Sequence, residues 1–190
     1  MSESAHTPAL SEVAAKLRAL CEARARAELA AADALAPGSD RVAWRGALLA
    51  EVAVVKGLPG PAEATGGAAL SGADGGALGK ALEALGWAPD TVFFTLSRPE
   101  VGIDPERRAG RLRLQLEAVD PRAIVALDAE AAADLAEAFG CELFKPGVAA
   151  RVLGRTLVAV DGFEDALRDG RRKQVVWSQL KAVRAEGPVY

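Results

Sequence analysis

The first long pattern of apolar and polar positions in the chain is helical. From Ala9 to about residue 34 almost every residue is a strong helix former. The large apolar residues on or near one stripe of this segment are Leu10, Val13, Leu17, Leu20 and Leu29. The Pro-Gly pair in residues 36–40 ends the pattern. We therefore expect a helix over about 9–35 that packs on the rest of the domain, preceded by a disordered tail over residues 1–8.

Four short apolar runs, rich in β-branched or aromatic residues, predict buried strands. These runs are residues 48–57, 91–96, 122–127 and 155–160. Helical patterns follow them at residues 74–85, 104–119, 129–139 and 164–185, and a short bridging helix is expected at 44–48. Asp104 followed by Pro105 is typical of a helix start, with an N-cap and a proline in the first turn.

Strands that alternate with helices of this length favour βαβ units with right-handed crossovers. The expected fold is α/β, with three layers in the order α/β/α around a central four-stranded parallel sheet. We expect one domain over residues 9–190. Ligands of open parallel sheets bind beyond the carboxyl ends of the strands. A functional site should therefore be drawn from the loops at 56–71, 96–102, 128–130 and 161–164.

Composition narrows the function classes. The chain has 190 residues, of which 51% are hydrophobic and 5% aromatic, with a formal net charge of −3. That charge does not favour general attraction to DNA or anionic membranes, although local basic patches are compatible with it. The chain has no apolar run of membrane-spanning length and no signal-peptide pattern, so we expect a cytoplasmic protein without a membrane partner. Two distant cysteines, Cys21 and Cys141, predict buried thiols rather than a disulfide, zinc or iron–sulfur site.

The glycine-rich segment at 56–72 is the most distinctive loop. It lacks both the GxxxxGK[ST] spacing of a P-loop and the GxGxxG spacing of a dinucleotide fold. Two interpretations stay open: backbone N–H groups that contact an anion, and a purely structural turn. The one histidine, His6, lies in the expected tail, which argues against histidine general-base chemistry.

Acidic and basic side chains near the strand ends supply weak candidates. Asp161, Glu63 and Asp128 are the candidate catalytic carboxylates, with Glu164 nearby, although an acid after a strand is usually a helix cap. The C-terminal segment carries four basic residues that are candidates for nucleic-acid contact or for a solvated helix face: Arg168, Arg171, Arg172 and Lys173.

The order and spacing of these sequence segments resemble those of the uracil-DNA glycosylases of the iron–sulfur-containing class, family 4. That family has a loop of the form GEAPGxxEDxxGxPFVGxAGxLL after a strand. Residues that match it in ungapped spacing are Pro59, Gly60, Glu63, Gly67, Gly72, Gly75 and Leu78. The segment QLEAVDPRAIVALDAEAAADL (115–135) is similar to the family's QIELVRPRVIVALGRFAAQAL. The resemblance extends over about residues 48–180 and implies the family's fold.

The same resemblance implies that the reactive positions are replaced. The family's water-handling carboxylate corresponds to Gly57 and its uracil-stacking phenylalanine to Leu70. Its base-reading asparagine corresponds to Leu96, and its late histidine to Asp161. The four cluster cysteines are not retained as a set, so no cofactor is expected. The ligand-pocket positions implied in this way are Gly57, Pro59, Gly60, Leu70, Leu96 and Asp161.

These replacements favour a catalytically degenerate glycosylase-like protein that binds DNA or another protein. A flipped base is normally held by stacking and by hydrogen bonds, and leucine supplies neither. One alternative is a divergent, active base-excision glycosylase that uses Asp161, Glu63 or Asp128. The other alternative is a structural protein-interaction domain that docks through its long N-terminal helix.

Overall fold

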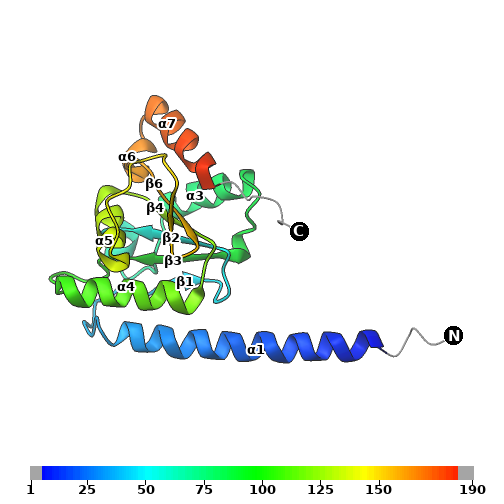
Figure 1. Ribbon diagram of the computed structural model, residues 1–190. Coiled ribbons are helices and arrows are strands. Elements are labelled where there is room, and N and C mark those ends of the chain that lie inside the picture. Colours follow the sequence, from blue (N-terminus) through cyan, green and yellow to red (C-terminus); the bar gives the residue numbers. More distant parts are fainter. Residues whose placement is uncertain (1–5, 184–190) are drawn as a thin grey trace.

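The computed structural model describes residues 6–183, which form a sheet with strand order β1-β3-β2-β4-β6-β5 (Figure 1). The four inner strands are parallel: β2 (Val52–Lys56), β3 (Val92–Leu96), β4 (Ala123–Ala126) and β6 (Arg155–Ala159). Two short strands pair antiparallel at the edges: β1 (Arg45–Gly46) and β5 (Ala150–Val152). The predicted α/β fold with a central four-stranded parallel sheet is therefore confirmed.

The edge strands were missed, and the predicted bridging helix at 44–48 was wrong. Arg45 and Gly46 pair with Phe94 and Phe93 of β3, and Gly46 adopts a positive φ of 106°. A strand of two residues is too short to show an alternating apolar pattern, and only its position beside β3 creates it. β5, with three residues, is similarly short and is only partly buried.

Helices cover both faces of the sheet, because successive strand side chains point to opposite sides. Val52 and Val54 belong to one apolar cluster, and Ala53 and Val55 to the other. The helices are α1 (His6–Asp33), α2 (Pro61–Ala64), α3 (Ala73–Ala84), α4 (Pro105–Val119), α5 (Ala129–Phe139), α6 (Phe163–Ala166) and α7 (Gly170–Leu180). Helices α3 and α7 contribute to the first cluster, and α4 and α5 to the second. The sheet is therefore the middle layer of three, with helices on each side.

The single C-terminal helix predicted over 164–185 is instead divided. α6 ends at Ala166, and α7 starts at Gly170 and is followed by a 3-10 turn over Lys181–Val183. Asp169 causes the restart, since its carboxylate accepts hydrogen bonds from the N–H groups of Arg171 and Arg172. Residues 184 and 185 of the predicted helix lie outside the described residues.

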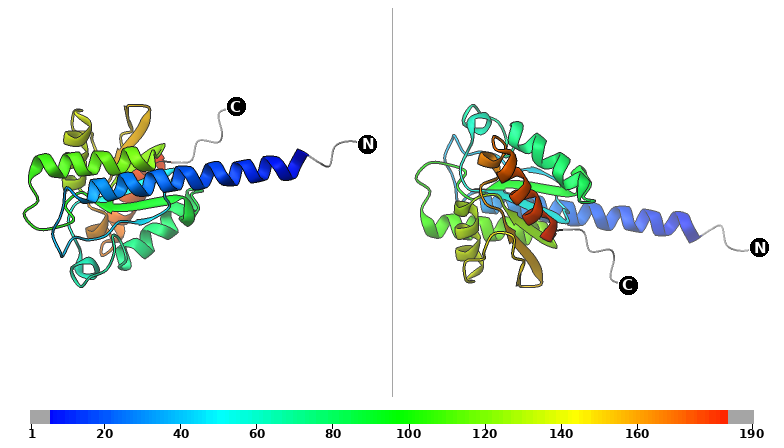
Figure 2. Two further views of the ribbon diagram at one scale, coloured as in Figure 1. Left: turned by 90° about the horizontal axis from the view of Figure 1, so that it is seen from below. Right: turned by 90° about the horizontal axis from the view of Figure 1, so that it is seen from above.

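Helix α1 extends well beyond the body of the protein (Figures 1 and 2). It begins at His6, so residues 6–8 of the expected tail are helical, and residues 1–5 lie outside the described residues. Leu29 is fully buried, whereas Leu17 is 57% exposed. Twelve residues separate them, which at 3.6 residues per turn places them about 120° apart around the helix. The predicted shared stripe was therefore wrong for Leu29. The prediction of buried thiols was also wrong for Cys21, which is exposed on α1, and Cys141 is only partly buried.

The C-terminal end of α1 is fixed to the body through Asp33. One carboxylate oxygen of Asp33 accepts hydrogen bonds from Arg111 at 3.3 Å and from Gln115 at 3.1 Å, both on α4. The other oxygen accepts the indole N–H of Trp44 at 3.2 Å. Arg111 is fully buried, and this burial lowers its pKa to about 10 although Asp33 opposes the shift. The guanidinium therefore stays charged at neutral pH and needs Asp33 as its partner.

We expect Asp33→Ala to lower the free energy of unfolding by about 3–5 kcal/mol, because it leaves the Arg111 charge buried without a partner. Asp40→Ala is the matched control: it makes the same chemical change at an exposed site and should stay within about 0.5 kcal/mol of the parent. Urea unfolding followed by circular dichroism measures both. Equal stability of the two variants would contradict the role of Asp33.

Candidate functional site

A buried lysine lies at the carboxyl end of the central strand β2. Lys56 is the last residue of β2, and its side chain is 6% exposed. Its ammonium nitrogen lies 2.6 Å from a carboxylate oxygen of Asp74 and 2.9 Å from one of Glu164. An oxygen of Glu63 lies 3.8 Å away. A buried ammonium group needs compensating negative charge, and these carboxylates supply it.

Two of these carboxylates also organise the glycine-rich loop. Glu63, in α2, accepts the N–H of Gly60 at 3.0 Å and the N–H of Leu70 at 2.7 Å. Asp74, in the first turn of α3, accepts the N–H of Gly75 at 2.8 Å. Two N–H groups of the loop, those of Gly60 and Leu70, are thereby tied to a carboxylate near Lys56. This network of protein groups holds the backbone of the glycine-rich turn in place.

The charge state of Lys56 limits what it can do chemically. Burial lowers its pKa, but hydrogen bonds to Asp74 and Glu164 outweigh that effect, and the net shift raises the pKa. A lysine acts as a nucleophile or a general base only when its amine is neutral. Lys56 therefore serves as a fixed cation at neutral pH.

A cavity of about 210 Å³ opens beside this lysine, at the predicted edge of the sheet. Its lining residues are Lys56, Leu58, Pro59, Asp74, Leu127, Asp128, Glu130, Gly162, Phe163, Glu164 and Asp165. Five of them are acidic and one is basic, so the cavity carries an excess of negative charge. Sites for drug-sized ligands usually measure about 300–1,000 Å³, and this one is smaller.

Asp128 lies on the cavity wall and closes the space beside Gly57. One oxygen of Asp128 accepts the N–H of Ala131 at 2.7 Å and caps α5, and the other accepts the N–H of Gly57 at 2.9 Å. Burial raises the pKa of Asp128, and its two backbone hydrogen bonds only partly offset that rise. A Cβ atom added to Gly57 would lie 2.6 Å from a carboxylate oxygen of Asp128. Asp128 thus occupies the position that a side chain at residue 57 would take.

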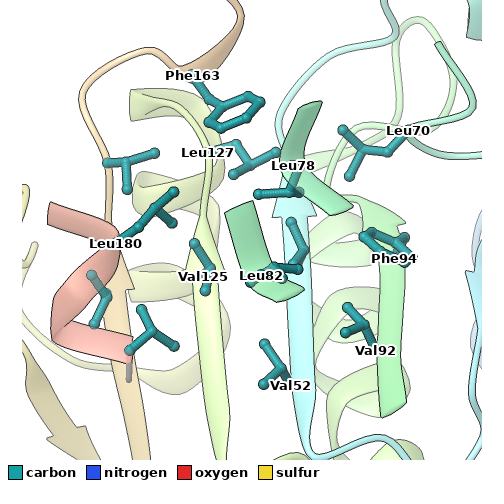
Figure 3. Close-up of a cluster of buried hydrophobic side chains, with 14 of the residues drawn as sticks. Val52, Leu70, Leu78, Leu82, Val92, Phe94, Val125, Leu127, Phe163 and Leu180 are labelled. Atoms are coloured by element: carbon teal, nitrogen blue, oxygen red, sulfur yellow. The ribbon is translucent and has the colours of Figure 1, made fainter. Parts of the chain in front are cut away.

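Leu70 and Leu96 do not line the cavity. Both are 1% exposed and belong to the apolar cluster between the sheet and α3. Figure 3 shows Leu70 in this cluster, together with Leu78 and Phe94. The backbone of Leu70 adopts a positive φ of 54° and is fixed by hydrogen bonds from its N–H to Glu63 and from Arg45 to its carbonyl oxygen. Leu70 and Leu96 are therefore packed into the core.

The remaining sequence-derived positions are dispersed. Pro59 lines the cavity, and a Cβ atom on Gly60 would lie 2.6 Å from the ammonium nitrogen of Lys56. Asp161 is exposed and outside the lining, and its backbone N–H donates to Gln179 at 2.9 Å. The four basic candidates Arg168, Arg171, Arg172 and Lys173 are all exposed near the start of α7. They stand among acids: Arg172 lies 4.0 Å from Asp165, and Asp169 caps the helix.

Sequence reasoning missed Lys56 and Asp74 as the centre of this region. The signal was present, because a lysine ends a run that the pattern predicts to be buried. A buried lysine requires anionic partners. The sequence does not show which acids supply them, since Asp74 and Glu164 lie 18 and 108 positions away.

No protein-family model matches this chain, and no curated protein is significantly similar to it. Over residues 6–183, no group of three or more histidine, cysteine or acidic side chains is placed to hold a metal ion. No helix in that range is long and apolar enough to cross a bilayer.

We expect Lys56→Met to lower the free energy of unfolding by about 3–5 kcal/mol, because Glu63 and Asp74 would remain buried as unpaired anions. Lys80→Met makes the same change at an exposed position of α3 and should shift stability by less than about 0.5 kcal/mol. Urea titrations of both variants provide the comparison. A Lys56→Met protein as stable as the control would show that the buried cation does not hold the loop in place.

Proposed function

We propose that this chain is a non-catalytic binding protein on a uracil-DNA glycosylase-like scaffold, and that its partner is a protein. One observation carries the proposal: the polar groups at the strand ends are engaged with one another, while Leu70 and Leu96 are packed in the core. The parallel order of the central strands and the match of the glycine-rich loop support the choice of scaffold.

The absence of catalysis follows from the groups that base excision needs. An extruded base needs an aromatic face and amide hydrogen bonds, and Leu70 and Leu96 offer neither. Removing one preorganised polar group from such a site typically lowers the rate by about 10²- to 10³-fold. Here the positions corresponding to the carboxylate, the aromatic ring and the amide are all replaced.

A protein partner fits the surface better than a nucleic acid does. The cavity is lined by Asp128, Glu130, Glu164 and Asp165, whose negative charges repel phosphodiesters. The basic residues near α7 stand beside Asp165 and Asp169, which reduces their field. Helix α1, in contrast, exposes large apolar side chains, and exposed apolar patches are typical of protein-binding surfaces.

A second candidate function, divergent base excision, is favoured by the position of Asp128. Its carboxylate lies where a side chain on residue 57 would project, it borders the cavity, and its pKa is raised. Neither Asp161 nor Glu63 is among the residues that line the cavity. Asp128 is therefore the carboxylate that this alternative would need.

We expect the purified protein to leave no abasic sites in DNA. Oligonucleotides that contain uracil, hypoxanthine or an alkylated base are incubated with the protein and cleaved with alkali, and the products are resolved on a denaturing gel. Asp128→Asn and Asp161→Asn are assayed in parallel. Cleavage by the parent protein that disappears only in Asp128→Asn would overturn the proposal and establish the second candidate.

We also expect no salt-dependent binding of single- or double-stranded DNA at micromolar protein. Fluorescence anisotropy at about 50 and 200 mM salt measures it, because phosphate contacts weaken steeply over that range. Tight binding at low salt that is lost in a variant with Arg171, Arg172 and Lys173 changed to alanine would reverse the choice of partner. Arg107→Ala, an exposed position on α4, serves as the control for charge alone.

A further inference from the structure

The projecting part of α1 carries a stripe of apolar side chains that are each more than half exposed. Every residue from 10 to 21 is exposed. Within them Leu10, Val13, Leu17 and Leu20 are 65%, 53%, 57% and 67% exposed. They lie on one side of the helix, since three- and four-residue steps return to the same face. We define these four residues as the leucine stripe.

The leucine stripe does not continue the face that packs on the body. The body contacts α1 through Ala25, Leu29 and Ala32, which are buried. At about 100° per residue, the middle of the stripe points about 110° away from the middle of these three residues. Contact with the body therefore leaves the stripe fully available to a second molecule.

The spacing of the stripe is symmetric. Its steps of three, four and three residues read the same in both directions around position 15. An isologous contact requires a surface that is complementary to itself after a twofold rotation. Two antiparallel α1 helices centred at position 15 would place Leu10 opposite Leu20 and Val13 opposite Leu17, in alternating layers of the kind that helix pairs use.

The position of the body is compatible with this pairing. Among residues 10–33 of α1, Ala25 is the first that is buried, ten positions beyond the centre of the stripe, or about 15 Å along the axis. In an antiparallel pair the two Ala25 residues would therefore lie about 30 Å apart along the axis, with one body toward each end. A parallel pair would bring both bodies to the same end.

Charged pairs maintain the helix where the body does not support it. Glu12 pairs with Lys16 at 2.7 Å and Arg18 with Glu22 at 3.0 Å, each four residues apart and on the surface. Pairs at this spacing stabilise an isolated helix. The stripe is thus presented on a preformed helix, which reduces the conformational entropy lost on association.

We propose that α1 mediates an antiparallel dimer with a second copy of this chain through the leucine stripe. This inference rests on the proposed function only in treating α1 as the protein-docking surface. Two short stripes form a contact of a few helical turns, so we expect reversible association at micromolar concentrations rather than an obligate dimer.

Sedimentation equilibrium of the full chain from about 1 to 200 µM tests the association. We expect a monomer–dimer equilibrium whose dissociation constant rises at least tenfold in Leu17→Glu. Ala15→Glu adds the same charge on the opposite side of the helix, at an exposed position, and should change the constant less than twofold. A monomer over the whole range, or equal effects of the two variants, would overturn the proposal.

Cysteine crosslinking tests the orientation. In an antiparallel pair centred at position 15, two Cys21 residues lie about 18 Å apart along the axis, and two residues at position 14 lie about 3 Å apart. A short bis-maleimide should therefore link Ala14→Cys chains in a Cys21→Ser, Cys141→Ser background, but not Cys21 chains that carry Cys141→Ser alone. Equal crosslinking at both positions would indicate a parallel pair and overturn the proposal. Neither assay contains DNA, so a failure here is distinct from a failure of the proposed function.

Discussion

The positive charge of Lys56, buried at the end of the central strand, is the constraint on which the site region depends. A buried ammonium group requires anionic partners, and Asp74, Glu63 and Glu164 come from α3, α2 and α6. Segments that are distant in the sequence are thereby brought around one atom. The conformation of the glycine-rich loop is a consequence, because Glu63 also binds the backbone N–H groups of Gly60 and Leu70.

This arrangement directs polar groups inward at the edge of the sheet where a parallel α/β fold normally binds its ligand. Lys56 stays charged and paired, and Asp128 accepts backbone hydrogen bonds from Gly57 and Ala131. Leu70 and Leu96 are packed in the core. The cavity that remains is small and acidic. These features support binding by the outer surface of the protein over chemistry at the strand ends.

The outer surface is most unusual along α1, where several large apolar side chains are exposed. Asp33 fixes the C-terminal end of this helix through Arg111, Gln115 and Trp44, so the projecting end has a defined direction. The buried Arg111 also donates to the carbonyl oxygen of Leu96, at the end of β3. The same contact therefore links the proposed docking helix to the sheet, and the proposed dimer would hold two bodies in a fixed relation.

The sequence by itself determined the α/β class, the four parallel strands and most helix positions, because apolar periodicity and helix caps such as Asp104 are local signals. It also located the glycine-rich segment at 56–72, which begins at the end of strand β2. Only the tertiary structure decided that β1 and β5 extend the sheet, that Lys56 pairs with Asp74 and Glu164, and that the stripe on α1 faces away from the body. Those features depend on which distant residues meet and on how each helix is rotated about its axis, and a one-dimensional pattern specifies neither.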